Sequence, residues 1–321
     1  VNAGNSITSG GNYNVTVGDE AGTAITTGDN NVAIGYNSLA ANTTGTLNTA
    51  VGKDAGLSVT TGIENTLIGG NAGDALITGS YNIAVGKDAL GADTDGGYNV
   101  AVGYLALSVQ DFTTATNSFN TGVGAQAGRR ITTGIENTIV GAQAGDSLTD
   151  ADYNVAIGKE SLTTDTLGSR STAIGFKALK TQNFTSATET LNVAVGFAAG
   201  EFVTTGIHNT LIGGNAGDAI TTGNDNTSVG YRALTANTTA SYNTAIGGDS
   251  LYANTTGAGN TGTGYNALAG NTTGSDNVAV GYLALDANTT ASNNTAVGKS
   301  ALGTNTTGSE NVAMGVNSLL A

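Results

Sequence analysis

Few side chains of this protein could carry out acid–base or metal chemistry, and they form no recognisable constellation. His208 is the only histidine among 321 residues, and the chain has no cysteine. His208 occupies the place within a 17-residue repeat that Glu64 and Glu136 hold in other copies, so we interpret it as a turn residue. A transition-metal site needs several His or Cys ligands, and no Ser-His-Asp set converges here. We therefore predict no catalytic residue, no metal, no cofactor and no enzyme activity.

Two glycine-rich segments resemble ligand-binding loops without meeting their requirements. GGNAGD occurs at 69–74 and 213–218, but its Gly and Asp offsets differ from those of calcium-binding glycine-rich repeats, so we interpret it as a turn with an exposed aspartate. The segment 262–270 is not followed by the crossover helix of a dinucleotide loop. A polysaccharide-cleaving β-helix would need paired carboxylates in a groove, and no such pair repeats here.

Two recurring groups of side chains could serve binding or modification. Exposed tyrosine rings would suit sugar or protein contacts, and the alternative is that they stack along the repeat. Tyrosine recurs at the residue after the repeat glycine: Tyr36, Tyr104, Tyr231, Tyr265 and Tyr282. Six Asn-Thr-Thr sequences could accept glycans in a secreted protein, and the alternative is turn chemistry: Asn42, Asn237, Asn254, Asn271, Asn288 and Asn305.

The composition excludes two classes of partner. The net charge is −14, with only ten Lys and Arg residues, whereas phosphate binding needs a basic surface, so we expect no nucleic acid. No apolar run reaches the ~18 residues of a membrane span, and no signal peptide is visible. Absence of proline leaves a backbone donor at every position, as a continuous strand ladder requires.

A pentapeptide of the type Asn-(Thr/Val)-Ala-(Val/Ile)-Gly recurs along the whole chain. Most of its glycines follow one another with a constant 17-residue spacing, as Gly52 follows Gly35, and only two of the gaps are longer, by four residues each. A short fixed period indicates one small unit stacked on itself. We number each unit from its Asn, which is position 1, so that the invariant Gly is position 5. Position 1 is Asn in 17 of 18 units, and Ser171 is the exception.

A unit of this length can hold two short strands and two tight turns. β-Branched residues at positions 2 and 4 favour a strand, and Gly at position 5 suits a turn with positive φ or a close backbone approach. Stacked Asn and Gly ladders are expected, represented by Asn48, Gly52, Asn277 and Gly281. The predicted fold is all-β: a β-solenoid, or β-roll, of about 18 coils whose strands pair in parallel. We expect 1–321 to form one continuous repeat array, a segment of a longer fibre.

Positions 9 and 12 are coupled. In seven units position 9 is Gly and position 12 is aliphatic, and in eight others of ordinary length position 9 is Leu and position 12 is polar. Leu234 with Asn237 is an example of the second kind. Large side chains at both positions would overpack a narrow core, whereas the absence of a large side chain at both would leave a cavity. The pattern predicts one core slot per coil, filled from either position; copying of two repeat types is the alternative.

The alternation of a strand sends positions 2 and 4 to one face and position 3 to the other. We expect Val or Ile at position 4 to join Leu at position 9 inside the coil, so that Ala at position 3 forms an outward ladder. Such a strip, which includes Ala245 and Ala279, could pack against the same strip of another chain. A coil this thin has little core of its own, and both points favour a parallel homo-oligomer over a lone solenoid.

The pentads resemble those of YadA-like trimeric autotransporter adhesin heads, as in NVAIG at 31–35 and NTAVG at 48–52. The 17-residue period is longer than the ~14 of that head, and longer units such as NVAVGYLALDANTTASN at 277–293 are similar to those of bacteriophage tail-fibre shafts. The resemblance implies a trimeric extracellular fibre on a virion tail or bacterial surface. It also implies a glycan or protein receptor on a cell surface.

The two longer units carry four extra residues, within 107–120 and 179–192. Because the core slot has a fixed length, the insertions are expected to leave the coil as bulges. Phe112, Phe119 and Phe184 are candidate partner contacts in these segments, and the alternative is that Phe112 and Phe184 fold back to cover the coils.

The sequence thus favours a structural and adhesive fibre shaft that mediates attachment to a host or surface. An ice-binding β-solenoid is the alternative, since Thr recurs at positions 2, 13 and 14. Interruptions at 76–79 and 93–96 count against a regular Thr surface.

Overall fold

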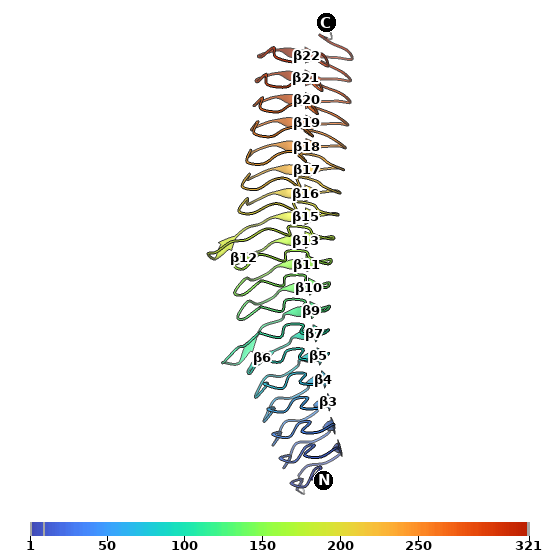
Figure 1. Cartoon of the computed structure of the whole chain (residues 1–321), viewed down its shortest axis with the longest axis vertical. Coiled ribbons are helices and arrows are strands. Elements are labelled where there is room, and N and C mark those ends of the chain that lie inside the picture. Colours follow the sequence, from blue (N-terminus) through green and yellow to red (C-terminus); the bar gives the residue numbers. More distant parts are fainter. Residues whose placement is uncertain (1, 9, 320–321) are drawn as a thin grey trace. The chain divides into compact units, whose positions relative to one another are not determined.

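The computed structural model describes residues 2–8 and 10–319 and divides the chain into two compact units, Val1–Lys159 and Glu160–Ala321. Each unit is a parallel β-solenoid with no α-helix among its described residues (Figure 1). Each holds nine three-residue strands, one for each coil, so the two units together contain 18 coils. The predicted all-β solenoid with its 17-residue period is therefore confirmed.

The strands of the first unit are β1 (Val15–Val17), β2 (Val32–Ile34), β3 (Thr49–Val51), β4 (Thr66–Ile68), β5 (Ile83–Val85), β6 (Gly96–Gly97), β7 (Val100–Val102), β8 (Thr116–Asn117), β9 (Thr121–Val123), β10 (Thr138–Val140) and β11 (Val155–Ile157). Those of the second are β12 (Gly168–Ser169), β13 (Thr172–Ile174), β14 (Thr188–Glu189), β15 (Val193–Val195), β16 (Thr210–Ile212), β17 (Thr227–Val229), β18 (Thr244–Ile246), β19 (Thr261–Thr263), β20 (Val278–Val280), β21 (Thr295–Val297) and β22 (Val312–Met314).

Strands of successive coils pair in parallel and in register, position for position. Thr244 of β18 pairs with Thr261 of β19, which holds the same position in the next repeat. The longer coils keep this register, since Val100 of β7 pairs with Thr121 of β9 across the first insertion. The repeat therefore determines which residues lie above one another within each unit.

The invariant glycine is needed for two independent reasons. Its φ lies between +115° and +142° in every coil, a region that side chains rarely adopt. A Cβ atom on Gly69 would also lie only 2.5 Å from the carbonyl oxygen of Gly86 in the next coil. Position 5 thus disfavours any other residue by conformation in every coil and by space in every coil but the last described one, where a Cβ on Gly315 meets nothing within 4 Å.

Position 3 faces the core, so the prediction that its alanines form an outward ladder is wrong. The alanines of that ladder are all buried: Ala33, Ala50, Ala84, Ala101, Ala156, Ala173, Ala194, Ala245, Ala279, Ala296 and Ala313. The neighbouring position-4 residues point outward instead, and Ile34 and Ile246 are 37% and 41% exposed. The interior already holds an aliphatic side chain from position 9 or 12 and a buried Ala at position 8, so the strand contributes its small residue and directs its larger ones outside.

The shared core slot agrees with the packing. Leu at position 9 is buried in one kind of coil and the aliphatic residue at position 12 in the other, for example Leu234 and Ile220. A Cβ atom built on Gly217, at position 9, would lie 2.8 Å from Cδ1 of Ile220, so the two positions do compete for one space. Position 9 has a left-handed φ in both kinds, +56° at Leu234, and for a non-glycine residue this costs about 1–2 kcal/mol. Leucine at position 9 fills the core slot but strains the backbone. Glycine there avoids the strain but leaves the slot to be filled by another position.

Position 3 contributes to the same volume. Three coils carry a large buried residue there, Leu67, Ile139 and Leu211, and each of them has Gly at position 9. A Cβ on Gly73, at position 9 of one such coil, would lie 2.8 Å from Cδ2 of Leu67. The core slot is therefore filled jointly from positions 3, 9 and 12.

The long coils form a second, shorter pairing with the coil that precedes them. Gly96 and Gly97 of β6 pair in parallel with Thr116 and Asn117 of β8, and β12 pairs with β14 in the same way. Figure 1 shows the segment that carries β6 reaching farther from the three-residue strands than the loops of neighbouring coils do. The insertions are therefore ordered, paired segments of their units.

Candidate functional site

The position-1 asparagines form a buried ladder rather than a binding surface. Asn48 is fully buried, its Nδ2 donates to the Gly62 carbonyl at 2.8 Å, and its Oδ1 accepts the backbone N–H of Asn65 at 3.0 Å. Asn277 repeats the arrangement in the second unit, accepting from the backbone N–H of Asn294 at 3.0 Å. Each amide thus closes its own coil and joins it to the next.

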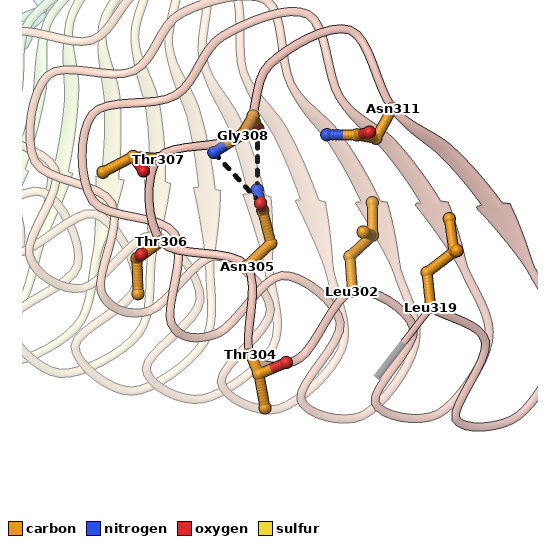
Figure 2. Close-up of a pocket in the computed structure, with 8 residues that line it drawn as sticks. All are labelled: Leu302, Thr304, Asn305, Thr306, Thr307, Gly308, Asn311 and Leu319. Atoms are coloured by element: carbon orange, nitrogen blue, oxygen red, sulfur yellow. Dashed lines mark hydrogen bonds between the residues drawn. The ribbon is translucent and has the colours of Figure 1, made fainter. Parts of the chain in front are cut away.

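The Asn-Thr-Thr asparagines at position 12 act as turn clamps. Figure 2 shows Asn305, whose Oδ1 accepts the Gly308 N–H at 3.1 Å and whose Nδ2 donates to the Gly308 carbonyl at 2.8 Å. Five of the six are fully buried: Asn42, Asn237, Asn254, Asn271 and Asn288. Their amides are not accessible for glycosylation in the folded coil, so turn chemistry accounts for these sequences. The hollow of about 290 Å³ in Figure 2 lies beside this turn and is also lined by Leu302 and Leu319.

An apolar row lies on the outer face of the strands in each unit. Exposed Val, Ile and Met residues at positions 2 and 4 recur along it: Val15, Val17, Ile34, Ile68, Ile83, Ile212, Ile246, Val280, Val312 and Met314. Tyr at position 6 continues the row, and Tyr265 stacks on Tyr282 with ring centroids 5.8 Å apart. Exposed apolar side chains that gather on one face are typical of interaction surfaces in soluble proteins.

Threonines form a further row at positions 13 and 14. The position-13 hydroxyls bond to the next coil, as Thr221 Oγ1 does to the Thr238 carbonyl at 3.0 Å. The position-14 residues are exposed, including Thr222 and Thr239. Only one of the two Thr positions therefore offers free hydroxyls to solvent.

Each insertion encloses a buried carboxylate–amide pair. In the first, Asp93 Oδ2 accepts from Gln110 Nε2 at 2.7 Å, and its Oδ1 accepts the Phe112 N–H at 3.1 Å. Asp165 and Gln182 repeat this pair at 2.6 Å in the second. An all-acceptor carboxylate suits a site where two donors converge. The sequence reading missed this pair, although Asp replaces Asn at position 12 in both coils that precede an insertion.

The three insertion aromatics lie in different surroundings. Phe112 and Phe184 are only 8% and 7% exposed, which favours the covering role over partner contact. Phe119 is 49% exposed. It is the last residue of its long unit, equivalent to position 17 of an ordinary unit, and lies at the end of a row of aromatic rings. Tyr81 and Tyr98 form the rest of that row, with centroids 4.7 Å apart, and Phe119 follows Tyr98 at 5.2 Å.

A hollow of about 210 Å³ lies beside this row and the β6–β8 pair. Its lining includes both tyrosines together with Asp95, Thr116 and Asn117. Asp95 Oδ1 accepts the hydroxyl of Thr78, which also lines the hollow. The sequence reading did not identify Tyr81 and Tyr98, although the recurrence of aromatic residues at position 17 in three successive coils was a visible signal.

Other candidate residues occupy structural places. His208 lies in a turn with φ of +60°, and its Nδ1 is 3.2 Å from Oδ1 of Asp225. Asp74 and Asp218 of the two GGNAGD segments are half-buried rather than exposed, and burial raises the pKa of both carboxyls. Among residues 2–8 and 10–319 no three His, Cys, Asp or Glu side chains are grouped as metal ligands would be. No helix in that part of the chain is long and apolar enough to cross a membrane.

Comparison with known proteins gives no relative from which a function could be transferred: no family model matches the chain, and a search of curated proteins finds no match. The surfaces of the two solenoid units are therefore the basis for a functional assignment.

Proposed function

We propose that this protein is a structural and adhesive fibre shaft, built from three parallel copies of the chain and located outside the cell, on a virion tail or a bacterial surface. The observation that carries the proposal is the set of exposed apolar side chains at positions 2 and 4, which occur in several coils of each unit. A monomer would leave this row in water, and exposed apolar patches of more than a few hundred Å² are rare on monomers. A glycan or protein on a target cell is the proposed receptor.

Three copies in parallel suit this row better than an unrelated partner does. Because strands of successive coils stack in register, a second copy in the same direction meets each coil with an equivalent coil. Outward Ile246 and Val280 would pack between chains, while the alanines beside them stay in each chain's own core. This arrangement replaces the alanine-mediated interface that the sequence suggested.

Sedimentation of the purified chain tests the assembly. We expect a trimeric mass at micromolar concentration, and a monomeric mass in the double variant Ile246→Glu, Val280→Glu with an unchanged β-type circular dichroism spectrum. Ile77→Glu is the matched control, since Ile77 is 40% exposed but lies at position 13, away from the row. A monomeric wild-type chain would remove the fibre proposal.

An ice-binding solenoid is the alternative class. It is less well supported because the position-13 hydroxyls are bonded within the chain, so that the threonine surface has a single free row. Thermal hysteresis of the purified protein distinguishes the classes: a freezing gap at micromolar concentration would favour ice binding.

A further inference from the structure

We infer that the hollow beside Tyr81, Tyr98 and Phe119 is a saccharide-binding site that takes one sugar ring of a longer glycan. The inference deepens the proposed attachment function by placing a ligand class at a defined site in the first unit. It also stands on its own observations, which are the aromatic row, the polar lining of the hollow and the contrast between the two insertions.

The aromatic row is exposed and ordered. The three rings are 38%, 42% and 49% exposed in chain order, and the planes of Tyr81 and Tyr98 lie 18° apart. Tyr98 lies between the other two rings, so the row presents ring edges and phenolic hydroxyls rather than open faces. A sugar ring can pack its apolar C–H groups against the exposed aromatic carbon of this row and exchange hydrogen bonds with the tyrosine hydroxyls, because tyrosine combines an apolar ring with a polar tip.

The polar lining matches a neutral, hydroxyl-rich ligand. Asp95 contributes a carboxylate, which only accepts hydrogen bonds, and Asn117 contributes an amide that both donates and accepts. The Asn117 side chain is exposed and makes no hydrogen bond to another described side chain. The lining contains no cationic side chain, so an anionic group such as a phosphate would meet only the negative charge of Asp95.

The size of the hollow limits the ligand. Its volume of about 210 Å³ is below the ~300–1,000 Å³ of pockets that enclose a drug-sized molecule. It therefore suits a single ring, with the remainder of the chain lying on the outside of the coil. The lining residues come from three successive coils: from β6, β8 and the residues beside them, and from the segment 78–81 that precedes β5. None of them belongs to the three-residue strands that carry the proposed trimer interface.

The second insertion shows that the fold does not require this set of residues. At the equivalent places of that insertion, Tyr98, Asn117 and Phe119 are replaced by Arg170, Glu189 and Leu191. Arg170 Nε there pairs with Glu189 Oε1 at 3.1 Å, between β12 and β14. An insertion of the same length thus folds with an ion pair in place of the aromatic and amide side chains. The aromatic set of the first insertion is then available for a ligand.

Saturation-transfer NMR on the full chain tests the site with neutral tetrasaccharides of hexose and of N-acetylhexosamine, and with a tetralysine peptide. We expect transfer to ring protons of at least one saccharide, and a loss of affinity of at least tenfold in Tyr98→Arg, Asn117→Glu, which copies the ion pair of the second insertion. Tyr242→Ser is the control: Tyr242 is 69% exposed and also lies at position 17, but in a coil of the second unit without an insertion, so this variant should bind as wild type.

Three results would overturn the inference: no saccharide of the set receives saturation, the double variant binds as well as wild type while melting normally, or only the lysine peptide binds. The last would assign the hollow to a basic peptide. Failure here is separable from failure of the fibre proposal, because trimer formation is read independently by sedimentation and does not involve these residues.

Discussion

Two adjacent glycines, Gly69 and Gly70, have opposite structural requirements although both belong to one GGNAGD segment. Gly69 has φ of +135°, and a Cβ there would lie 2.5 Å from the Gly86 carbonyl oxygen. At Gly70 an added Cβ meets nothing within 4 Å. We expect Gly69→Ala to lower the free energy of unfolding by at least about 1–3 kcal/mol, and Gly70→Ala to change it by less than about 0.5 kcal/mol. Urea unfolding measures both, and equal losses would contradict the close-approach argument.

The core slot makes a prediction about Leu234 and Asn237. Leu234→Gly relieves left-handed strain of about 1–2 kcal/mol but removes a buried leucine, which costs about 2–5 kcal/mol. Adding Asn237→Leu refills the slot while losing the bond from Asn237 Nδ2 to the Ala240 carbonyl at 3.0 Å, so we expect partial rescue. A double-mutant cycle should give a favourable coupling above about 0.5 kcal/mol. Simple additivity would show that the two positions do not share space.

The residue scale also shows where sequence reasoning fails. The coupling of positions 9 and 12 was visible because it involves side-chain volume, and packing agrees with it. The prediction that the position-3 side chain points outward was wrong because the alternation in a three-residue strand does not say which face is buried. A shift of one residue exchanges the buried and exposed faces. Leu67 and Leu211 held the missing signal, since a large residue at position 3 coincides with Gly at position 9.

At the scale of elements, the first insertion has one part that packs against the coils and another part that is exposed to solvent. Phe112 is nearly buried and its N–H bonds to Asp93, whereas Phe119 is half exposed. The constant repeat length predicted that four extra residues leave the coil, but Gly96 pairs with Thr116, which lies in the following coil. No local pattern specifies that pairing, so the hollow next to it could not be derived from the sequence.

The difference in burial between Phe112 and Phe119 predicts different outcomes for the two Phe→Ser changes. Phe112→Ser should destabilise the chain by about 3–5 kcal/mol, as for loss of a buried aromatic side chain. Phe119→Ser should change stability by less than about 1 kcal/mol, since half of the ring is already in water. Thermal melts followed by circular dichroism measure both. If Phe112→Ser melts like wild type and instead abolishes attachment to target cells, Phe112 is a partner contact.

At the scale of the whole molecule, stability is the sum of many nearly equivalent coil contacts. Nearly every described coil contributes one aliphatic slot, one Asn amide and one Gly close approach, with Ser171 and Gly315 as exceptions. Repeat proteins behave approximately as sums of units and interfaces. The acidic surface works against this sum, because a net charge of −14 repels itself at neutral pH. The outward apolar side chains are removed from water only by association of chains and not by the fold of a single chain, so in the proposed trimer assembly adds to the stability of the molecule.

Protonation gives the last prediction. Burial raises the pKa of Asp74, Asp93, Asp218 and Asp286, whereas a hydrogen bond from Lys53 lowers the pKa of the partly buried Asp54. A carboxyl whose pKa is raised binds its proton more tightly in the folded state than in the unfolded state. Its contribution to the stability of the fold is therefore complete below the ordinary pKa of about 3.9. That contribution is lost as pH rises through the higher folded value.

We therefore expect the Tm to be higher at pH 4.5 than at pH 7.5, in opposition to the small Asp54 effect. Part of this rise reflects relief of general repulsion, which salt screens over a Debye length of about 3 Å at 1 M. The part that belongs to Asp93 should persist in 1 M NaCl. Calorimetry of Asp93→Asn isolates it, because Asn does not titrate: the Tm deficit of the variant relative to wild type should be largest at pH 4.5 and shrink toward pH 7.5. A deficit that grows with pH would mean that Asp93 is stabilised as the carboxylate by Gln110 and the Phe112 N–H, and would reverse the assigned direction.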